Sequence, residues 1–297
     1  MSSPRASTTE TSNRHGATLT VGGLTITGVC TGGIATSIAV PELGVAWDVG
    51  ACPHTTVTAK TLLLTHAHPD HMGSLHAWLG MRMLYRMPTA TLVVPAWIGD
   101  EVRGLVDVWG RLQGRAFDVR LVDARPHEEI PLRRGLHVVP FKSAHVIPTL
   151  GYVVVRRKQK LRAPWLGLPG LEIARLRADG AHDLFEVVDE PLIAYTGDTL
   201  PELIDREPLV RTCRVLLIEC TFVDDRKPRE AVRAGGHIHV DDLASRAEAF
   251  ENEVVVLVHF SQLYDSAEVR ALIAERLPVS LLERVRLFTG GGPREEP

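Results

Sequence analysis

The residues best suited to chemistry are four potential metal ligands gathered within six positions. His66, His68, Asp70 and His71 directly follow the apolar run of residues 61–64. The run predicts a buried strand, and an extended backbone would send His66 and His68, two residues apart, to the same side. Neutral imidazole and carboxylate are standard zinc ligands. A solvated polar loop is the alternative, but it gives no reason for this set at a strand end.

Three more potential ligands also follow apolar runs: His145, Asp198 and His259. Each alone is weak evidence, because an aspartate after a strand is usually a turn residue and a single histidine there is usually structural. Together with the first four they supply enough ligands for two ions. Two metal ions about 3.5–4 Å apart can hold a shared hydroxide and both oxygens of a displacement at phosphorus.

Three further polar residues have open interpretations. His237 and His239 precede a predicted helix, where they are either exposed beside a cap made by Asp241, or bring a general acid to the site at His237. Glu219 ends another apolar run, and a buried carboxylate there needs a partner. That partner is an imidazole, a metal ligand or a structural ion pair.

The elements that must position these side chains are short strands interleaved with helices. This pattern indicates one α/β domain over residues 17–297, preceded by a flexible polar arm at residues 1–16. The expected strands are residues 24–30, 37–41, 45–50, 61–66, 89–95, 136–142, 151–157, 192–198, 214–222 and 254–260. The expected helices are residues 72–87, 99–112, 240–251 and 267–277.

The composition is that of a globular protein. The 297 residues are 45% hydrophobic and 23% charged, with a net charge of −3, which excludes a disordered body and a wholly basic nucleic-acid protein. No stretch approaches ~18–20 apolar residues, so no membrane span is expected. The N-terminal arm has no apolar core of a secretory signal, so a cytoplasmic location is expected.

The order of the ligands resembles a known family. The motif from His66 to His71, followed by His145, Asp198 and His259, resembles the metallo-β-lactamase fold, a four-layer αββα sandwich with a two-zinc site. Further segments are similar to the tRNase Z branch, and most of all to its short plant-type members, from about Gly23 to Phe288. These segments are residues 145–152, 195–199, 218–225, 236–244 and 258–264.

The resemblance implies a role for each ligand. His66, His68 and His145 would bind one zinc ion, Asp70, His71 and His259 would bind the second, and Asp198 would bridge the two. The subunit would thus hold two zinc ions, although manganese or iron could occupy the same ligands.

It also implies the chemistry. A hydroxide between the ions would attack the phosphorus after the discriminator nucleotide of a precursor tRNA, with Asp70 helping to activate it. His237 would protonate the leaving 3′ oxygen, and Glu219 would orient His237 or a ligand. A homodimer is implied as well, in which the neighbouring subunit helps to hold the RNA.

The sequence departs from the family in two places. The interval between His145 and Asp198 is short and holds a reduced basic, exosite-like segment at residues 155–180, as in the plant-type enzymes. The segment is either an RNA contact with Trp165 for stacking, or a solvated basic edge with Trp165 packed on the core. Its candidate RNA-binding residues are Arg156, Arg157, Lys158 and Lys160. Near residues 31–40 the loop that many relatives use to sense a CCA end is absent.

Together these features predict a zinc-dependent hydrolase of phosphodiesters, with 3′-end processing of precursor tRNA as its reaction. A small-molecule phosphodiesterase, or another hydrolase on the same scaffold, is the second interpretation, because one fold supports many reactions. A non-catalytic RNA-binding subunit is the third, and the complete ligand set argues against it.

Overall fold

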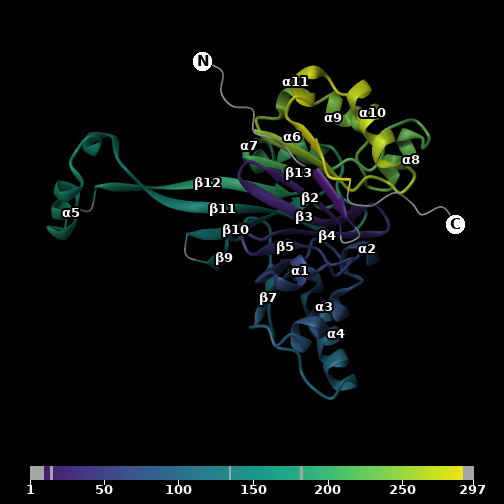
Figure 1. Ribbon diagram of the computed structural model, residues 1–297, viewed down its shortest axis with the longest axis horizontal. Coiled ribbons are helices and arrows are strands. Elements are labelled where there is room, and N and C mark those ends of the chain that lie inside the picture. Colours follow the sequence, from purple (N-terminus) through teal and green to yellow (C-terminus); the bar gives the residue numbers. More distant parts are fainter. Residues whose placement is uncertain (1–9, 14–15, 134, 181–182, 290–297) are drawn as a thin grey trace.

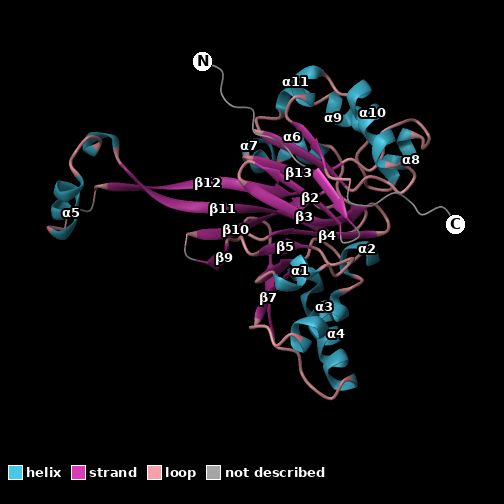
Figure 2. Ribbon diagram, viewed as in Figure 1, coloured by secondary structure: helices cyan, strands magenta, loops and turns pink. Residues whose placement is uncertain are grey.

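The computed structural model describes residues 10–13, 16–133, 135–180 and 183–289. Two β-sheets pack against each other, and helices cover their outer faces (Figures 1 and 2). This four-layer α/β/β/α arrangement confirms the predicted fold. Within the described residues, no helix is long and apolar enough to cross a membrane.

Each sheet follows chain order and changes from antiparallel to parallel pairing along its width. The eight-stranded sheet contains β1 (Glu10–Asn13), β2 (Gly16–Val21), β3 (Leu24–Thr31), β4 (Ala35–Val40), β5 (Val45–Trp47), β6 (Thr61–Leu63), β7 (Ala90–Pro95) and β8 (Val119–Ala124), and is parallel from β5 onward. The seven-stranded sheet contains β9 (Ile130–Arg133), β10 (Leu136–Ser143), β11 (Thr149–Leu161), β12 (Phe185–Tyr195), β13 (Val215–Glu219), β14 (Val254–Val258) and β15 (Val285–Leu287), and is parallel from β12 onward.

The short parallel strands are apolar throughout because both of their faces are buried. In β6, Leu63 points into the layer between the sheets, whereas Leu62 points outward beneath the helices. Leu217 and Leu216 divide in the same way in β13. Successive side chains of a strand point to opposite faces, so a strand covered on both sides loses the alternation with polar residues.

The helices form two outer layers, one for each sheet. The eight-stranded sheet is covered by α1 (His54–Thr58), α2 (Pro69–Met72), α3 (Leu75–Leu84) and α4 (Gly99–Leu112). The seven-stranded sheet is covered by α6 (Glu202–Arg206), α7 (Pro208–Thr212), α8 (Arg229–Ala234), α9 (Val240–Ala244), α10 (Ser266–Arg276) and α11 (Val279–Leu282). The helix predicted over residues 240–251 is wrong after Ala244, where the backbone closes i→i+3 turns instead.

Residues 155–180, predicted to form a reduced basic, exosite-like segment, lie on a protruding arm. β11 and β12 stay paired well beyond the body of the sheet, as far as Leu161 and Phe185, and α5 (Gly170–Ala178) lies at the tip (Figure 1). The strands continue because their backbone groups satisfy one another without support from a core. Val187 is accordingly 63% exposed.

Part of the N-terminal segment predicted as a flexible arm forms a strand. Glu10–Asn13 form β1, which pairs antiparallel with the beginning of β2, and Gly16 already belongs to β2. A polar sequence can form an edge strand because pairing uses backbone groups alone. The rest of the predicted arm, residues 1–9 and 14–15, lies outside the described residues.

Candidate metal centre and its neighbours

The predicted ligands all lie beyond the carboxyl ends of strands, at one edge of the sandwich. The loop after β6 leads into α2, and together they carry four of them, while β10, β12 and β14 are each followed by one. They are His66, His68, Asp70, His71, His145, Asp198 and His259. Carboxyl ends of parallel strands meet at the same edge of a sheet, which is why segments far apart in sequence converge there.

The first group of donor atoms consists of three imidazoles and one carboxylate. His68 Nδ1 lies 3.0 Å from His66 Nε2 and 3.3 Å from His145 Nε2. Asp198 Oδ2 lies 3.9 Å from the Nε2 atoms of both His66 and His145. These four atoms surround one point, as the ligands of a single ion would.

The second group shares Asp198 with the first. The Nε2 atoms of His71 and His259 are 3.3 Å apart, and Asp70 Oδ2 lies 3.6 Å from the one and 3.5 Å from the other. Asp198 Oδ1 lies 3.3 Å from His71 Nε2 and 3.4 Å from His259 Nε2. The two oxygens of Asp198 therefore face one group each.

These groups fit divalent cations. Tetrahedral zinc with Zn–N bonds of ~2.0–2.1 Å separates its nitrogens by about 3.3 Å, close to the distances observed. Asp198 Oδ1 is buried without a hydrogen-bond partner among the described residues, so a cation would satisfy it. Burial and the neighbouring charge of His71 lower the pKa of His66 to about 2, which leaves its Nε2 lone pair free to bind. The donor set and its geometry thus suit two ions.

Four of the histidines are oriented by hydrogen bonds from their other ring nitrogen. His66 Nδ1 contacts Thr65 Oγ1 at 2.9 Å, and His145 Nδ1 donates to the carbonyl of Gly236 at 3.0 Å. His71 and His259 have the partners described below. Such bonds fix the tautomer, so that the second nitrogen presents a lone pair to the centre.

Asp48 is an orienting residue that the sequence analysis missed. It is fully buried at the end of β5, where it accepts a 2.8 Å bond from His71 Nδ1 and further bonds from the backbone and hydroxyl of Thr65. Both Asp48 (φ 58°) and His259 (φ 62°) have left-handed backbones, which non-glycine residues adopt infrequently, although aspartate and histidine do so more often than most. Asp48 follows an apolar run, as Asp198 does, so the same signal could have identified it.

His237 lies beside both groups and is held by Glu219. Its Nδ1–H donates to Glu219 Oε1 over 3.1 Å, while Asp198 Oδ2 is 4.0 Å from the same nitrogen. Glu219 is completely buried and also accepts from the backbone N–H groups of Thr199 and Ile238. The carboxylate is therefore fixed, and it orients the imidazole with Nε2 as the remaining site for a proton.

Thr221 connects this pair to the second group. Its hydroxyl donates to Glu219 Oε2 at 2.5 Å, and its oxygen is 3.1 Å from His259 Nδ1. Since the threonine proton is engaged by the carboxylate, His259 Nδ1–H is the donor to Thr221. Thr221 was not predicted as a site residue, because a hydroxyl just after a strand carries no distinctive signal in the sequence.

The charge on Glu219 determines the protonation of His237. Burial alone would lower the pKa of His237, but the adjacent Glu219 carboxylate outweighs burial and raises this pKa to about 9. The imidazole is therefore protonated at neutral pH and can donate a proton. His239, by contrast, caps α9 and accepts the backbone N–H of Asp241, so it is structural.

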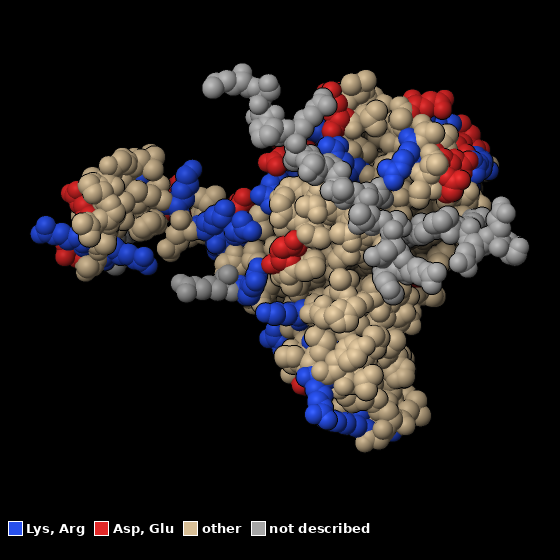
Figure 3. Space-filling model, viewed as in Figure 1, with Lys and Arg blue, Asp and Glu red and all other residues tan. Residues whose placement is uncertain are grey.

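The predicted RNA-binding residues lie along the arm, away from the centre, and most are paired with carboxylates. Arg156 and Lys158 contact Glu190 at 3.7 and 2.6 Å, and Arg157 contacts Asp189 at 2.7 Å and Glu129 at 2.8 Å. No ion pair is recorded within the described residues for Lys160. Basic side chains are visible on the arm and at its base (Figure 3).

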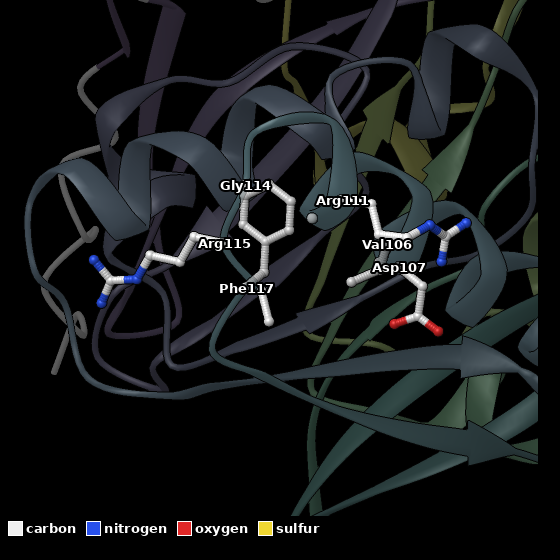
Figure 4. A pocket seen from close by; sticks show the side chains of 8 residues that line it. Val106, Asp107, Arg111, Gly114, Arg115 and Phe117 are labelled. Atoms are coloured by element: carbon white, nitrogen blue, oxygen red, sulfur yellow. The ribbon is translucent and has the colours of Figure 1, made fainter.

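A hollow away from the centre has no part in this arrangement. It lies at the end of α4, has a volume of about 450 Å³, and is lined by residues of α4 and of the loop that follows (Figure 4). Its lining includes Asp107, Arg111, Arg115 and Phe117 and none of the predicted ligands. The candidate chemistry therefore belongs to the edge of the sandwich.

Comparison with known families agrees with the fold and the grouped donors. The family model described as "Beta-lactamase superfamily domain" matches residues 48–260, a span that runs from Asp48 through His259. The chain belongs to this superfamily, which places its histidine and aspartate clusters among sites for divalent metal ions.

Within the superfamily the chain belongs to the tRNase Z family. It is 36% identical over 271 residues to tRNase Z TRZ1 of Arabidopsis thaliana, covering 91% of this chain and 96% of that protein. It is 33% identical over 250 residues to the chloroplastic tRNase Z TRZ2 of the same plant, covering 84% of this chain and 70% of that protein.

Solved structures show the same fold at low sequence identity. The metallo-β-lactamase fold protein YhfI of Bacillus subtilis has a TM-score of 0.60 at 13% identity, covering 87% of this chain and 93% of its own. The short form of human tRNase Z has a TM-score of 0.56 at 16% identity, covering 79% of this chain and 92% of its own.

Proposed function

We propose that this protein is a zinc-dependent endoribonuclease that cuts precursor tRNA after the discriminator nucleotide. The observation that carries the proposal is the pair of donor groups sharing Asp198, with the Glu219–His237 pair directly beside them. The kinship to proteins named tRNase Z supports RNA as the substrate.

His66, His68 and His145 would hold one ion, and Asp70, His71 and His259 the other, with one oxygen of Asp198 facing each group. When bound, two such ions polarise a phosphodiester and lower the pKa of water. Zinc is the proposed metal because imidazole and carboxylate are its usual ligands, and manganese or iron would accept the same set.

Three side chains would then handle protons and orientation. Asp70 would accept the proton of the attacking water, with its Oδ2 held by a 2.9 Å bond from the backbone N–H of Gly33. His237 would donate a proton from Nε2 to the leaving 3′ oxygen. Glu219 would keep His237 protonated and aimed, because its carboxylate bonds Nδ1.

The arm would contact the RNA at a distance from the cleaved bond. Arg156 and Arg157 lie at the base of the arm, beside Leu136 and Gly135 of the body, and Lys158 and Lys160 lie further out on β11, whose outer part projects with β12 (Figures 1 and 3). In a homodimer, an arm of this kind can reach RNA bound by the neighbouring subunit, and we propose that assembly here.

A small-molecule phosphodiesterase is the second candidate. The observation that favours it is the pairing of Arg156, Arg157 and Lys158 with carboxylates, which reduces the positive charge that the arm offers to RNA. Both candidates use the same centre and differ only in the substrate.

The two candidates are separated by mapping cleavage. The zinc-loaded protein is incubated with a precursor tRNA carrying a 3′ trailer, with Asp198→Ala as the control. A single cut after the discriminator nucleotide, absent in the variant, is the expected result. An intact RNA together with variant-sensitive hydrolysis of bis(p-nitrophenyl) phosphate would contradict the RNA proposal and support the small-molecule one.

A further inference from the structure

The segment from the end of β13 to the start of α8 borders the candidate centre and carries three basic side chains, which differ in whether a carboxylate neutralises them. Arg226 pairs with Asp224 at 2.7 Å and with Glu268, and Arg229 pairs with Asp241 at 3.0 Å. Lys227 lies between them in sequence, and no ion pair is recorded for it among the residues that the structure describes. Two of the three charges are thus neutralised within the protein, and the third remains available to an anion.

Lys227 is held in place without being neutralised. Its Nζ lies over the ring of Phe222, 4.6 Å from the centroid, and the side chain is half-buried. An aromatic face attracts an ammonium group but does not cancel its charge. Phe222 is buried, and its backbone bonds Ile238 and Val240, which fixes the ring relative to the segment that carries His237.

The ammonium group and the proposed proton donor both neighbour the ring of Phe222. The ring centroids of Phe222 and His237 are 6.4 Å apart, and the charge of Lys227 acts on His237 through space. His237 is assigned to the leaving 3′ oxygen, so Lys227 lies on the side of the centre where the leaving nucleotide must be. The next group along that strand is the 5′ phosphate of the same nucleotide.

We propose that Lys227 binds the backbone phosphate immediately 5′ of the cleaved bond, on the nucleotide that leaves with a free 3′ hydroxyl. This proposal rests on the proposed function and adds to it a contact close to the centre. A lysine ammonium group is a compact charge whose three donors can rotate to meet a phosphate. Such a contact positions the strand without reading its sequence. The effect should therefore be on binding and should be the same for every discriminator base.

The test compares Lys227→Gln with Lys60→Gln as the matched control. Lys60 is exposed and precedes β6, at the end of that strand opposite the centre. We expect Lys227→Gln to raise KM for precursor tRNA by about 5–10-fold, to change kcat by less than about twofold, and to reduce the slope of log KM against log salt by about 0.7–1. Lys227→Arg should restore most of the affinity. Equal KM values and equal slopes for the two glutamine variants would overturn the proposal.

A second pair of substrates separates this proposal from the function on which it rests. Adenylyl-(3′→5′)-adenosine and its 5′-phosphorylated form differ only in the phosphate assigned to Lys227. Should the wild-type protein leave tRNA intact, the proposed function fails, and these dinucleotides decide the role of Lys227. A lower KM for the phosphorylated form that disappears in Lys227→Gln would support the contact. Equal KM values in the wild type, or no hydrolysis of either dinucleotide, would overturn it.

Discussion

The candidate centre and the arm both concentrate charged side chains, yet the two regions balance their charge in opposite ways. In the centre, Asp198, His66, His71 and His259 are almost completely buried, and Asp198 Oδ1 has no hydrogen-bond partner among the described residues. On the arm, Arg157 is exposed and meets two carboxylates. A region whose charges are unsatisfied needs an external ion, whereas a region that is already balanced does not.

The energetic consequences differ accordingly. Removing one partner from a buried group of charges costs about 3–5 kcal/mol, whereas an exposed ion pair contributes about 0–1 kcal/mol. Side chains of the centre are therefore expected to be intolerant of change. Basic side chains of the arm can replace a carboxylate partner with an RNA phosphate at little cost in free energy. The replacement also contributes little to the affinity for RNA.

The largest effect is expected at the residue that both donor groups share. Asp198→Ala removes the carboxylate that faces both groups, so we expect loss of bound metal and a fall in activity of roughly 10³-fold or more. Metal content by elemental analysis and hydrolysis of both RNA and bis(p-nitrophenyl) phosphate measure this. A variant that kept two ions and its activity would show that Asp198 is not shared between ions.

The next effect is expected at the proposed proton donor. His237→Ala should lower kcat for RNA by about 10²–10⁴-fold, because an alkoxide leaving group needs a proton. Hydrolysis of bis(p-nitrophenyl) phosphate should change little, since p-nitrophenolate leaves without one. Metal content serves as the control, and loss of an ion in this variant would place His237 among the ligands.

A smaller effect is expected from the orienting carboxylate that the sequence analysis missed. Asp48→Asn keeps the size of the side chain but removes the charge that accepts the bond from His71 Nδ1. We expect metal affinity to fall by about 10–100-fold at one of the two sites. Competition with a chelator measures this, and Asp118→Asn, on an exposed surface loop, provides the control.

The pH dependence of cleavage should depend on Glu219. The raised pKa of His237 means that its proton is present below that pKa and is lost as the pH rises through it, so kcat for RNA should fall on the alkaline side. Glu219→Gln removes the charge that raises this pKa, and the alkaline limb should move to lower pH. If the alkaline limb of the kcat–pH profile did not move in Glu219→Gln, and the metal content equalled that of the wild type, another group would control the alkaline fall in kcat.

The smallest effect is expected on the arm. Replacing Arg156, Arg157 and Lys158 together with glutamine should raise KM for RNA by no more than about threefold, because each already faces a carboxylate. Hydrolysis of bis(p-nitrophenyl) phosphate should not change. A rise in KM larger than that of Lys227→Gln would reverse the comparison and make the arm the principal RNA contact.

Much of the fold and the candidate site could be predicted because the signals are local. An apolar run followed by a histidine or an aspartate is visible within ten residues, and it located His145, Asp198 and His259. The same runs indicated one α/β domain, and their lack of alternation reflects strands buried on both faces, whereas the four-layer arrangement was implied by the resemblance to the metallo-β-lactamase family. Asp48 also follows an apolar run, so the same local signal could have predicted it.

The sequence by itself determined the kinds of ligand, their order and the strands that end beside them, since strand formation and residue chemistry are local properties. Only the tertiary structure decided which charges meet. The register of β11 and β12 places Arg157 opposite Asp189, 32 positions away, which turns a basic stretch into a balanced one. The fold likewise brings Glu219 to His237 and leaves Lys227 without a carboxylate partner among the described residues. Such pairings depend on the path of the whole chain, and no local pattern contains them.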